Sequence, residues 1–322
     1  MTTPVASPGA PAVTALGGGH GLFASLSALR LMSDRLTAVV TVADDGGSSG
    51  RLRDELDVLP PGDLRMALAA LCDDSEWGRT WSDLLQHRFV SGGSLDKHAM
   101  GNLLIVALWE LLGDTVTGLD WVGRLLGARG RVLPMASVPL VVEADVRRDG
   151  VATLDTVVGQ SRVAVSEGRI EQLRLVPADP PACPEAVEAV RTADWVVLGP
   201  GSWYSSVLVH LLVPELARAL LETDARVCVT LNLAAERGET QGLTATDHLE
   251  ALFRHAPGLR VDAVLADPSA VEDVDELADA AQAMGARLLM RQVRRGDGTA
   301  RHDPLRLAAA YRDVFEGVYG DV

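Results

Sequence analysis

Two glycine-rich turns carry the residue types in this sequence that could bind phosphate. The first, residues 17–21, reads GGGHG and follows an apolar run at 13–16. The second, residues 44–51, reads DDGGSSGR and follows another apolar run at 39–43. Glycine lets the backbone approach an anion closely, and the N–H groups of a helix that begins at such a turn point toward that anion. We therefore expect phosphate to bind where these turns meet.

The first turn also fits a dinucleotide-binding pattern. Gly19, Gly21 and Ala24 have the G-x-G-x-x-A spacing, and Asp44 ends the next apolar run, where such folds hold a ribose hydroxyl. A glycine turn that serves only the packing of the next helix would show the same spacing. The pattern alone therefore leaves both a nucleotide site and a structural turn open.

The second turn concentrates acids, hydroxyls and an arginine in one loop. Asp44 and Asp45 could hold a ribose, orient a metal ion, or cap and turn the chain. Ser48 and Ser49 could donate hydrogen bonds to phosphate oxygens, and the Arg51 guanidinium could pair with phosphate through a fork of donors. A simple Asx turn before a helix would not require all of these side chains.

A third acid, Asp63, follows a Pro-Pro-Gly sequence and is placed to cap the helix that begins there. Beside Asp44 and Asp45 it is also a candidate metal ligand or general base. Mg²⁺ is the cation we consider, because it is usually bound by one or two carboxylates together with substrate phosphates. We assign no catalytic residue and treat these three carboxylates as candidates.

Polar residues also follow the later apolar runs. The run at 195–198 is followed by Gly-Pro-Gly-Ser, and the run at 227–231 is followed by Asn232. His98 and Asn102 lie four residues apart and so share one face of the helix predicted there. Ligands of doubly wound sheets collect at the carboxyl ends of the strands. We therefore expect these residues to face the same cleft as the glycine turns.

The motifs are positioned by predicted helices and strands that alternate along the chain. This alternation indicates an α/β fold, Rossmann-like and doubly wound, with a mainly parallel sheet. Short β-branched runs between about 131 and 176 indicate a β-rich insertion. We predict a disordered lead over 1–12 and a single domain over 13–322. The predicted strands are 13–16, 39–43, 138–142, 151–158, 163–165, 170–176, 195–198, 227–231, 263–266 and 288–290, and the predicted helices are 22–29, 64–71, 100–112, 184–191, 246–253, 274–284 and 304–315.

Composition excludes several functional classes. The 322 residues are 48% hydrophobic, which is enough to bury a substantial core. Their net charge of -15 argues against nucleic-acid binding, because that binding depends on a basic surface.

Cys72, Cys183 and Cys228 lie far apart and form no CxxC pair, so we expect reduced thiols. With neither a signal peptide nor an apolar run of membrane-spanning length, we expect no membrane span and a cytoplasmic location.

Several motifs together resemble a known family. The sequence contains GGGxGL, VTVADDGGSSGRLR, PPGDLR, HxxGNLL, LGPGSxY, and GET followed shortly by DH. This set resembles the YvcK-type gluconeogenesis factors, which are part of the wider superfamily of CofD, the phospholactate transferase of coenzyme F420 synthesis. The resemblance runs from about Val13 to Phe315, and the block ADDGGSSGR is highly specific.

The resemblance implies a Rossmann-like protein that binds a UDP-sugar, notably UDP-N-acetylglucosamine, and supports cell shape and cell-wall synthesis during growth on gluconeogenic carbon. That branch has no firmly assigned reaction, so we expect a regulatory protein with cell-wall regulatory partners. We also expect a homo-oligomer. Carried over by position, Gly17, Gly18, Gly19 and Gly21 would cradle the diphosphate; Asp44, Asp45, Gly46, Ser48, Ser49, Gly50 and Arg51 would line the nucleotide side; and Asn102, Gly199, Gly201, Ser202, Tyr204, Ser206 and Asn232 would form the opposing wall.

Three positions depart from the family pattern. His20 stands where threonine is common, Met66 where we expect asparagine, and Leu243 where the family usually carries tyrosine. A tyrosine could stack on uracil, and base stacking on an aromatic ring is worth about 1–3 kcal/mol in single-stranded nucleic-acid complexes. Leucine keeps apolar contact with the base and loses most of that stacking.

Two further functions follow from the same residues. The CofD resemblance suggests a Mg²⁺-dependent transferase similar to 2-phospho-L-lactate transferase, with Asp44, Asp45 and Asp63 as metal or general-base candidates. The glycine fingerprint alone suggests an NAD-dependent oxidoreductase. That alternative lacks a catalytic partner, because His98 and His210 are as easily structural.

Overall fold

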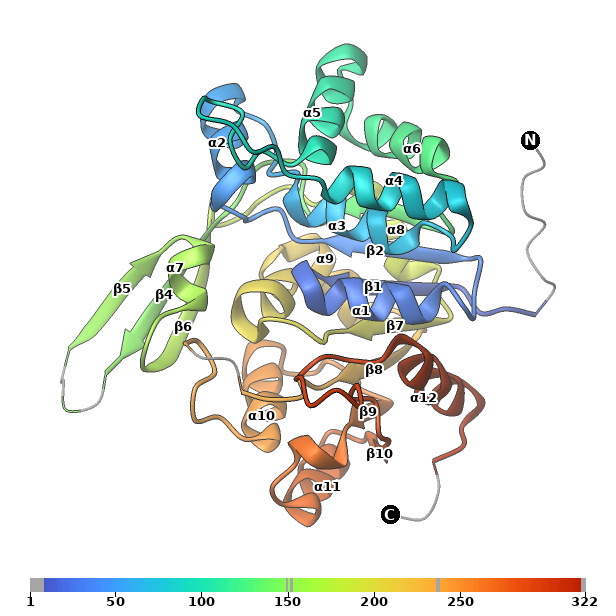
Figure 1. The fold of residues 1–322 in the computed structure, drawn as a ribbon. Coiled ribbons are helices and arrows are strands. Elements are labelled where there is room, and N and C mark those ends of the chain that lie inside the picture. Colours follow the sequence, from blue (N-terminus) through green and yellow to red (C-terminus); the bar gives the residue numbers. More distant parts are fainter. Residues whose placement is uncertain (1–8, 149, 151–152, 236–237, 320–322) are drawn as a thin grey trace.

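A seven-stranded parallel sheet forms the centre of the computed structural model (Figure 1). The structure describes residues 9–148, 150, 153–235 and 238–319; most of the lead predicted to be disordered lies outside them. The strands are ordered β10-β9-β8-β7-β1-β2-β3. They are β1 (Val13–Gly17), β2 (Leu36–Val40), β3 (Arg131–Pro134), β7 (Trp195–Leu198), β8 (Arg226–Thr230), β9 (Ala263–Ala266) and β10 (Arg287–Met290).

These strands are short apolar runs because both faces of the sheet are covered. All residues of β1, β7 and β9 are buried, as expected for parallel strands between helical layers. In the centre of the sheet, Leu16 pairs with Val39 on one side and with Leu198 on the other. The predicted α/β fold with a mainly parallel sheet is therefore confirmed.

The order in which strands are added to the sheet changes direction between β1 and β7. The chain runs from β1 through β2 to β3 in one direction, and from β7 through β8 and β9 to β10 in the other. Such a reversal creates a crevice at the carboxyl ends of the two central strands, where doubly wound folds bind ligands. Here the crevice lies between the loops that follow β1 and β7.

Helices cover the sheet and set the walls of this crevice. α1 lies between α3 and α12, while α8 packs against α9 on the other side of the sheet (Figure 1). α4, α5 and α6 form an outer group next to α3. The helices are α1 (Gly19–Leu29), α2 (Gly47–Leu56), α3 (Gly62–Leu71), α4 (Glu76–Gln86), α5 (Met100–Leu112), α6 (Thr115–Leu126), α8 (Pro184–Arg191), α9 (Pro214–Glu222), α10 (Ala245–His255), α11 (Val274–Ala283) and α12 (Pro304–Glu316), with a short 3₁₀ turn η3 (Pro268–Ala270).

A small antiparallel sheet projects from the main sheet and forms the insertion. Its order is β5-β4-β6, with β4 (Val141–Arg147), β5 (Leu154–Val158) and β6 (Arg169–Val176). The predicted insertion began too early, because β3 pairs with β2 in the main sheet. The strand predicted at 163–165 is wrong: the short helix α7 (Gln160–Ala164) occupies most of that segment and buries Val163 completely.

The segment after β7 does not form a regular α-helix. It forms a π-helical turn, η1 (Trp203–Val207), followed by a 3₁₀ turn, η2 (Leu208–Leu212). In the described part of the chain, no single helix has both the length and the apolar character to cross a membrane. One bent pair, η1–η2 with α9, meets the length and composition criteria only jointly and across an 83° bend.

Candidate functional site

Gly18 sits where three strand-end loops meet. A Cβ atom added at Gly18 would lie 2.5 Å from Asp63 Oδ2, 2.5 Å from Thr41 Cγ2 and 3.4 Å from Ser206 Oγ. Thr41 directly follows β2, and Ser206 belongs to the loop after β7. Glycine is therefore required at this position by close approach, because the loops after β1, β2 and β7 pack together here.

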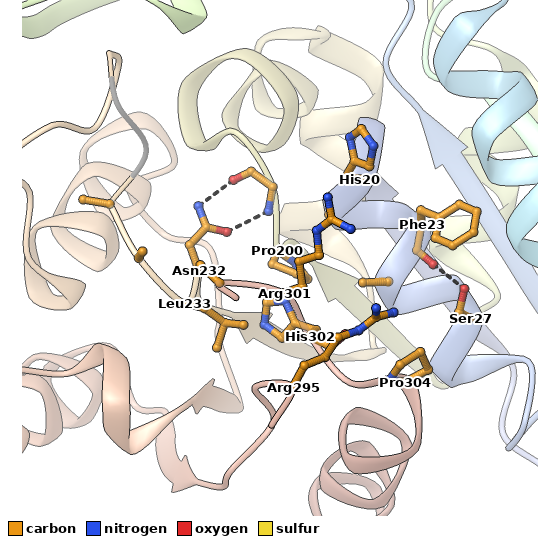
Figure 2. Close-up of a pocket in the computed structure, with 16 residues that line it drawn as sticks. His20, Phe23, Ser27, Pro200, Asn232, Leu233, Arg295, Arg301, His302 and Pro304 are labelled. Carbon is orange, nitrogen blue, oxygen red and sulfur yellow. Dashed lines mark hydrogen bonds between the residues drawn. The ribbon is translucent and has the colours of Figure 1, made fainter. Parts of the chain in front are cut away.

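The turn after β1 packs directly on the turn after β7. A Cβ atom at Gly21 would overlap the Pro200 carbonyl oxygen and lie 2.5 Å from Gly201 Cα. Asn232, which follows β8, fastens the second turn: its Oδ1 accepts from Gly201 N at 2.9 Å, and its Nδ2 donates to Gly201 O at 2.8 Å (Figure 2). The structure thus brings Gly21, Gly201 and Asn232 together, as their places at strand ends predict.

Asp63 does not cap α3. Pro61 occupies the cap position, and Asp63 lies in the first turn with its carboxylate turned toward Gly18. The pKa of Asp63 is raised to about 7, first by burial and then by the nearby Asp44 carboxylate, while a hydrogen bond from Gly19 N–H and the Arg65 charge oppose the shift. An acid of this kind can hold or release a proton near neutral pH.

The side chains of Asp44 and Ser49 both lie against Gly62, next to Asp63. A Cβ atom at Gly62 would lie 2.8 Å from Asp44 Oδ2 and would overlap Ser49 Oγ. Two carboxylates and a hydroxyl suit Mg²⁺, which usually takes one or two carboxylates and completes its shell with water or phosphate. Among the described residues, no group of three or more His, Cys, Asp or Glu side chains could hold a metal. A cation bound here would therefore need further oxygen atoms from the bound small molecule.

Ser48 is the centre of a buried hydrogen-bond cluster. Its Oγ accepts from Asn102 Nδ2 at 3.0 Å and from Ala99 N at 3.3 Å, and it lies 3.0 Å from His98 Nδ1. With both lone pairs used, the hydroxyl proton points to His98 Nδ1, which assigns the ring proton to Nε2. Burial, and then the Arg51 charge, lower the pKa of His98 and favour this neutral form. Ser48 therefore joins α2 to α5 and has no proton left for phosphate.

Two other residues of the second turn hold neighbouring loops. Asp45 Oδ1 accepts from Ser161 N in α7 at 2.9 Å. The Arg51 guanidinium donates to Ser94 O at 3.1 Å and to Asp96 O at 2.7 Å. Neither contact reaches the first glycine turn. Asp44 and Ser49 of the second turn therefore lie near the first turn, whereas Asp45 and Arg51 bind neighbouring segments.

Glu239 is a site residue that was missed among the predicted candidates. Its buried carboxylate accepts from Tyr204 N at 3.1 Å and from Ser205 N at 3.2 Å, which fixes the π-helical turn η1. Tyr204 is itself buried, with its ring edge-on to His255 at 6.0 Å between centroids. The sequence signal that could have identified Glu239 is the GET motif, but this motif lies far from η1 along the chain.

A cavity of about 460 Å³ opens beside the two packed turns. His20 and Gly21 at the start of α1, Pro200 and Gly201 after β7, and Asn232 and Leu233 after β8 form one side, and a C-terminal loop forms the other (Figure 2). That loop supplies Arg295, Arg301 and His302. None of these three residues was among the predicted site residues, although the stretch RRGDGTARH is basic in an acidic chain.

A second cavity of about 280 Å³ adjoins the first and shares Asn232, Leu233, Ala234 and Ala235 with it. Its other walls include Leu243 and Thr244, before α10, and Arg294. The first cavity is cationic and the second has both apolar and polar walls. The pair could therefore hold a ligand with an anionic part and a flat, partly apolar part.

The fold is that of a Rossmann-like α/β protein, and the candidate site lies at the switch point of its sheet. The family model for 2-phospho-L-lactate transferase CofD matches residues 13–294, and the chain belongs to the CofD family. This finding confirms the resemblance read from the motifs.

Individual relatives are similar over nearly their whole length. The gluconeogenesis factor of Bacillus subtilis is 35% identical over 320 residues, covering 95% of this chain and 98% of that protein. A Mycobacterium tuberculosis protein provisionally given the same name is 50% identical over 311 residues, covering 95% and 90%. A crystal structure of a UPF0052 family member from Bacillus halodurans superposes with a TM-score of 0.83 at 35% identity, covering 92% and 97%.

Proposed function

We propose that this protein binds a UDP-sugar, UDP-N-acetylglucosamine in the first instance, and acts as a regulator without turning the ligand over. The observation that carries the proposal is the 460 Å³ cavity between the start of α1 and the guanidinium groups of Arg295 and Arg301. In a chain of net charge -15, two arginines on one cavity wall favour an anionic ligand.

The diphosphate would lie between α1 and the arginines. Gly18, the cap residue of α1, offers no side-chain cap, and the first turn contains no acid. The Asp63 carboxylate accepts from Gly19 N–H, so the later N–H groups of this turn and the positive end of the helix dipole would face this space. Arg295 and Arg301 would donate from the opposite side, so the phosphates would be held from two directions.

The nucleoside would extend into the adjoining cavity. Leu243 and Thr244 offer an apolar and a hydroxyl contact there, and Arg294 adds a cation. Because Leu243 replaces an aromatic ring, we expect modest discrimination among bases. The sugar would then point toward Asp44 and Asp63, whose oxygens can accept from its hydroxyls.

A regulatory role fits the relatives, two of which carry the name of gluconeogenesis factors. In this proposal the protein acts in the cytoplasm as a homo-oligomer. It reports sugar-nucleotide supply to proteins that control cell-wall synthesis and cell shape when the cell grows on gluconeogenic carbon.

Calorimetry tests the binding step. Titration with UDP-N-acetylglucosamine should give saturable heat, whereas NAD and GTP should bind more weakly. Arg295→Ala with Arg301→Ala should weaken binding about 10-fold or more, because each charge-assisted hydrogen bond contributes about 1.5–3 kcal/mol. The exposed Arg312→Ala on α12 is the matched control. Tight NAD binding with no heat from the UDP-sugar would exclude the proposal.

The Asp44–Asp63 corner favours one alternative, a Mg²⁺-dependent transferase acting on a phospho-acid. The pKa of Asp63, about 7, suits a general base. Incubation with activated phospholactate, a deazaflavin acceptor and Mg²⁺ should then yield a product that mass spectrometry detects and that Asp63→Asn abolishes. Unchanged reactants would favour the regulatory role.

A further inference from the structure

The small helix α7 of the insertion touches the loops that follow three strands of the main sheet, β2, β7 and β8. After β2, Asp45 Oδ1 accepts from Ser161 N at 2.9 Å. After β7, Gln160 Nε2 donates to Ser205 O at 3.3 Å. After β8, Glu239 N donates to Ala164 O at 3.3 Å. One short element thus bridges strand ends from both sides of the switch point.

These contacts are tightly packed. Gly159, at φ +99°, lies so close to Asp45 that a Cβ atom there would overlap Asp45 Oδ2. A Cβ atom at Gly238 would likewise overlap the Ala164 carbonyl oxygen. Both glycines let the backbone come closer than a side chain would permit. A shift of either loop would therefore displace α7.

The same loops contact the crevice. Ser206 Oγ lies 3.5 Å from Gln160 Nε2. It also lies 3.4 Å from the position of a Cβ atom at Gly18, in the first glycine turn. Asp45 directly follows Asp44, which faces the Asp63 corner. Glu239, in turn, holds the N–H groups of Tyr204 and Ser205. A ligand that moves these groups moves the partners of α7.

α7 is in turn fixed to the three-stranded sheet. Val163 is fully buried, and Gly159 N donates to Val142 O in β4 at 2.8 Å. On the sheet itself, Asp145 accepts from Thr156 Oγ1 at 2.8 Å and from Arg174 Nη2 at 3.0 Å, which ties β4 to β5 and β6. The insertion is therefore linked internally as well as to α7.

We propose that Asp45 and Gln160 are positioning residues that couple ligand occupancy of the crevice to the insertion. This inference rests on the proposed UDP-sugar binding and adds the element that responds to it. A ligand changes an equilibrium only by its different affinity for the two states, and the resulting coupling is reciprocal. Weakening the contacts of α7 must therefore change ligand affinity and the response of the insertion together.

Hydrogen exchange with mass spectrometry, with and without saturating UDP-N-acetylglucosamine, tests the coupling. In the wild type, the ligand should slow exchange across β4, α7 and β6 by about 5-fold or more, the lower end of typical coupling energies. Gln160→Ala and Asp45→Ala should each still bind the ligand in calorimetry, with an altered affinity, and lose most of that protection. Glu167→Gln, an exposed position in the turn after α7, should behave as the wild type.

The two proposals fail separately. Ligand heat without any change of exchange in the insertion would overturn the coupling and leave UDP-sugar binding intact. Full protection in both Gln160→Ala and Asp45→Ala would also overturn it. Complete loss of binding in Asp45→Ala, with normal coupling in Gln160→Ala, would make Asp45 a ligand contact and contradict its positioning role. Absence of ligand heat in the wild type would remove the proposed function and this inference with it.

Discussion

A methyl group at Gly18 would collide with Asp63 and Thr41, both of which come from other elements. We expect Gly18→Ala to lower the free energy of unfolding by about 1–3 kcal/mol through overpacking and to abolish ligand heat. Gly123→Ala is the matched control: its Cβ atom would meet only Leu68 Cδ2, at 3.9 Å, inside α6, so it should be neutral or stabilising by up to about 1 kcal/mol. Urea unfolding measures the free energy of unfolding of both variants. An equal change in Gly18→Ala and Gly123→Ala would contradict the role of close packing at Gly18.

Asp63 sets a pH dependence whose sign follows from its pKa. The folded value, about 7, lies above the ordinary 3.8, so the unfolded chain releases this proton first as the pH rises. The corresponding stability is present below pH 3.8 and is lost as the pH rises toward 7. The wild type should therefore lose stability relative to Asp63→Asn across that window in denaturant titrations.

An exposed acid provides the control for this measurement. Asp54→Asn, on the solvent side of α2, should keep a constant stability difference from the wild type across the same pH range. If the free energies of unfolding of the wild type and Asp63→Asn changed in parallel with pH, Asp63 would not be the acid with the raised pKa. That result would contradict the assignment.

At the scale of elements, Ser48 joins the start of α2 to the start of α5. Ser48→Ala removes the shared acceptor of Asn102 Nδ2 and Ala99 N and the donor to His98. Leaving buried polar groups without partners costs about 1–3 kcal/mol, so the free energy of unfolding should fall by that amount. Ser94→Ala, exposed in the loop before α5, should have no effect. A Ser48→Ala protein as stable as the wild type would contradict the cluster.

Sequence periodicity predicted the elements that bury a clear apolar face. The helix expected at 100–112 and the strand expected at 195–198 match α5 and β7 at both ends. Asp63 was misplaced because Pro61 takes the cap position and the crevice competes for the carboxylate. The strand expected at 163–165 failed because short β-branched runs fit a strand or a helical turn equally well.

At the scale of the molecule, the site combines segments that sequence order keeps apart. The glycine turns and Asn232 were predictable, because each follows a buried strand and parallel strands end at one edge of the sheet. Arg295 and Arg301 were not, since they lie in a loop beyond the last strand whose path only the fold determines. Glu239 was missed for the same reason: its partners, Tyr204 and Ser205, are distant in sequence.

A crystal structure with UDP-N-acetylglucosamine tests the central claim most directly. The account predicts the diphosphate between the start of α1 and the guanidinium groups of Arg295 and Arg301, with the uracil in the adjoining cavity beside Leu243. A nucleotide bound elsewhere, or a cavity that stays empty at saturating ligand, would contradict it.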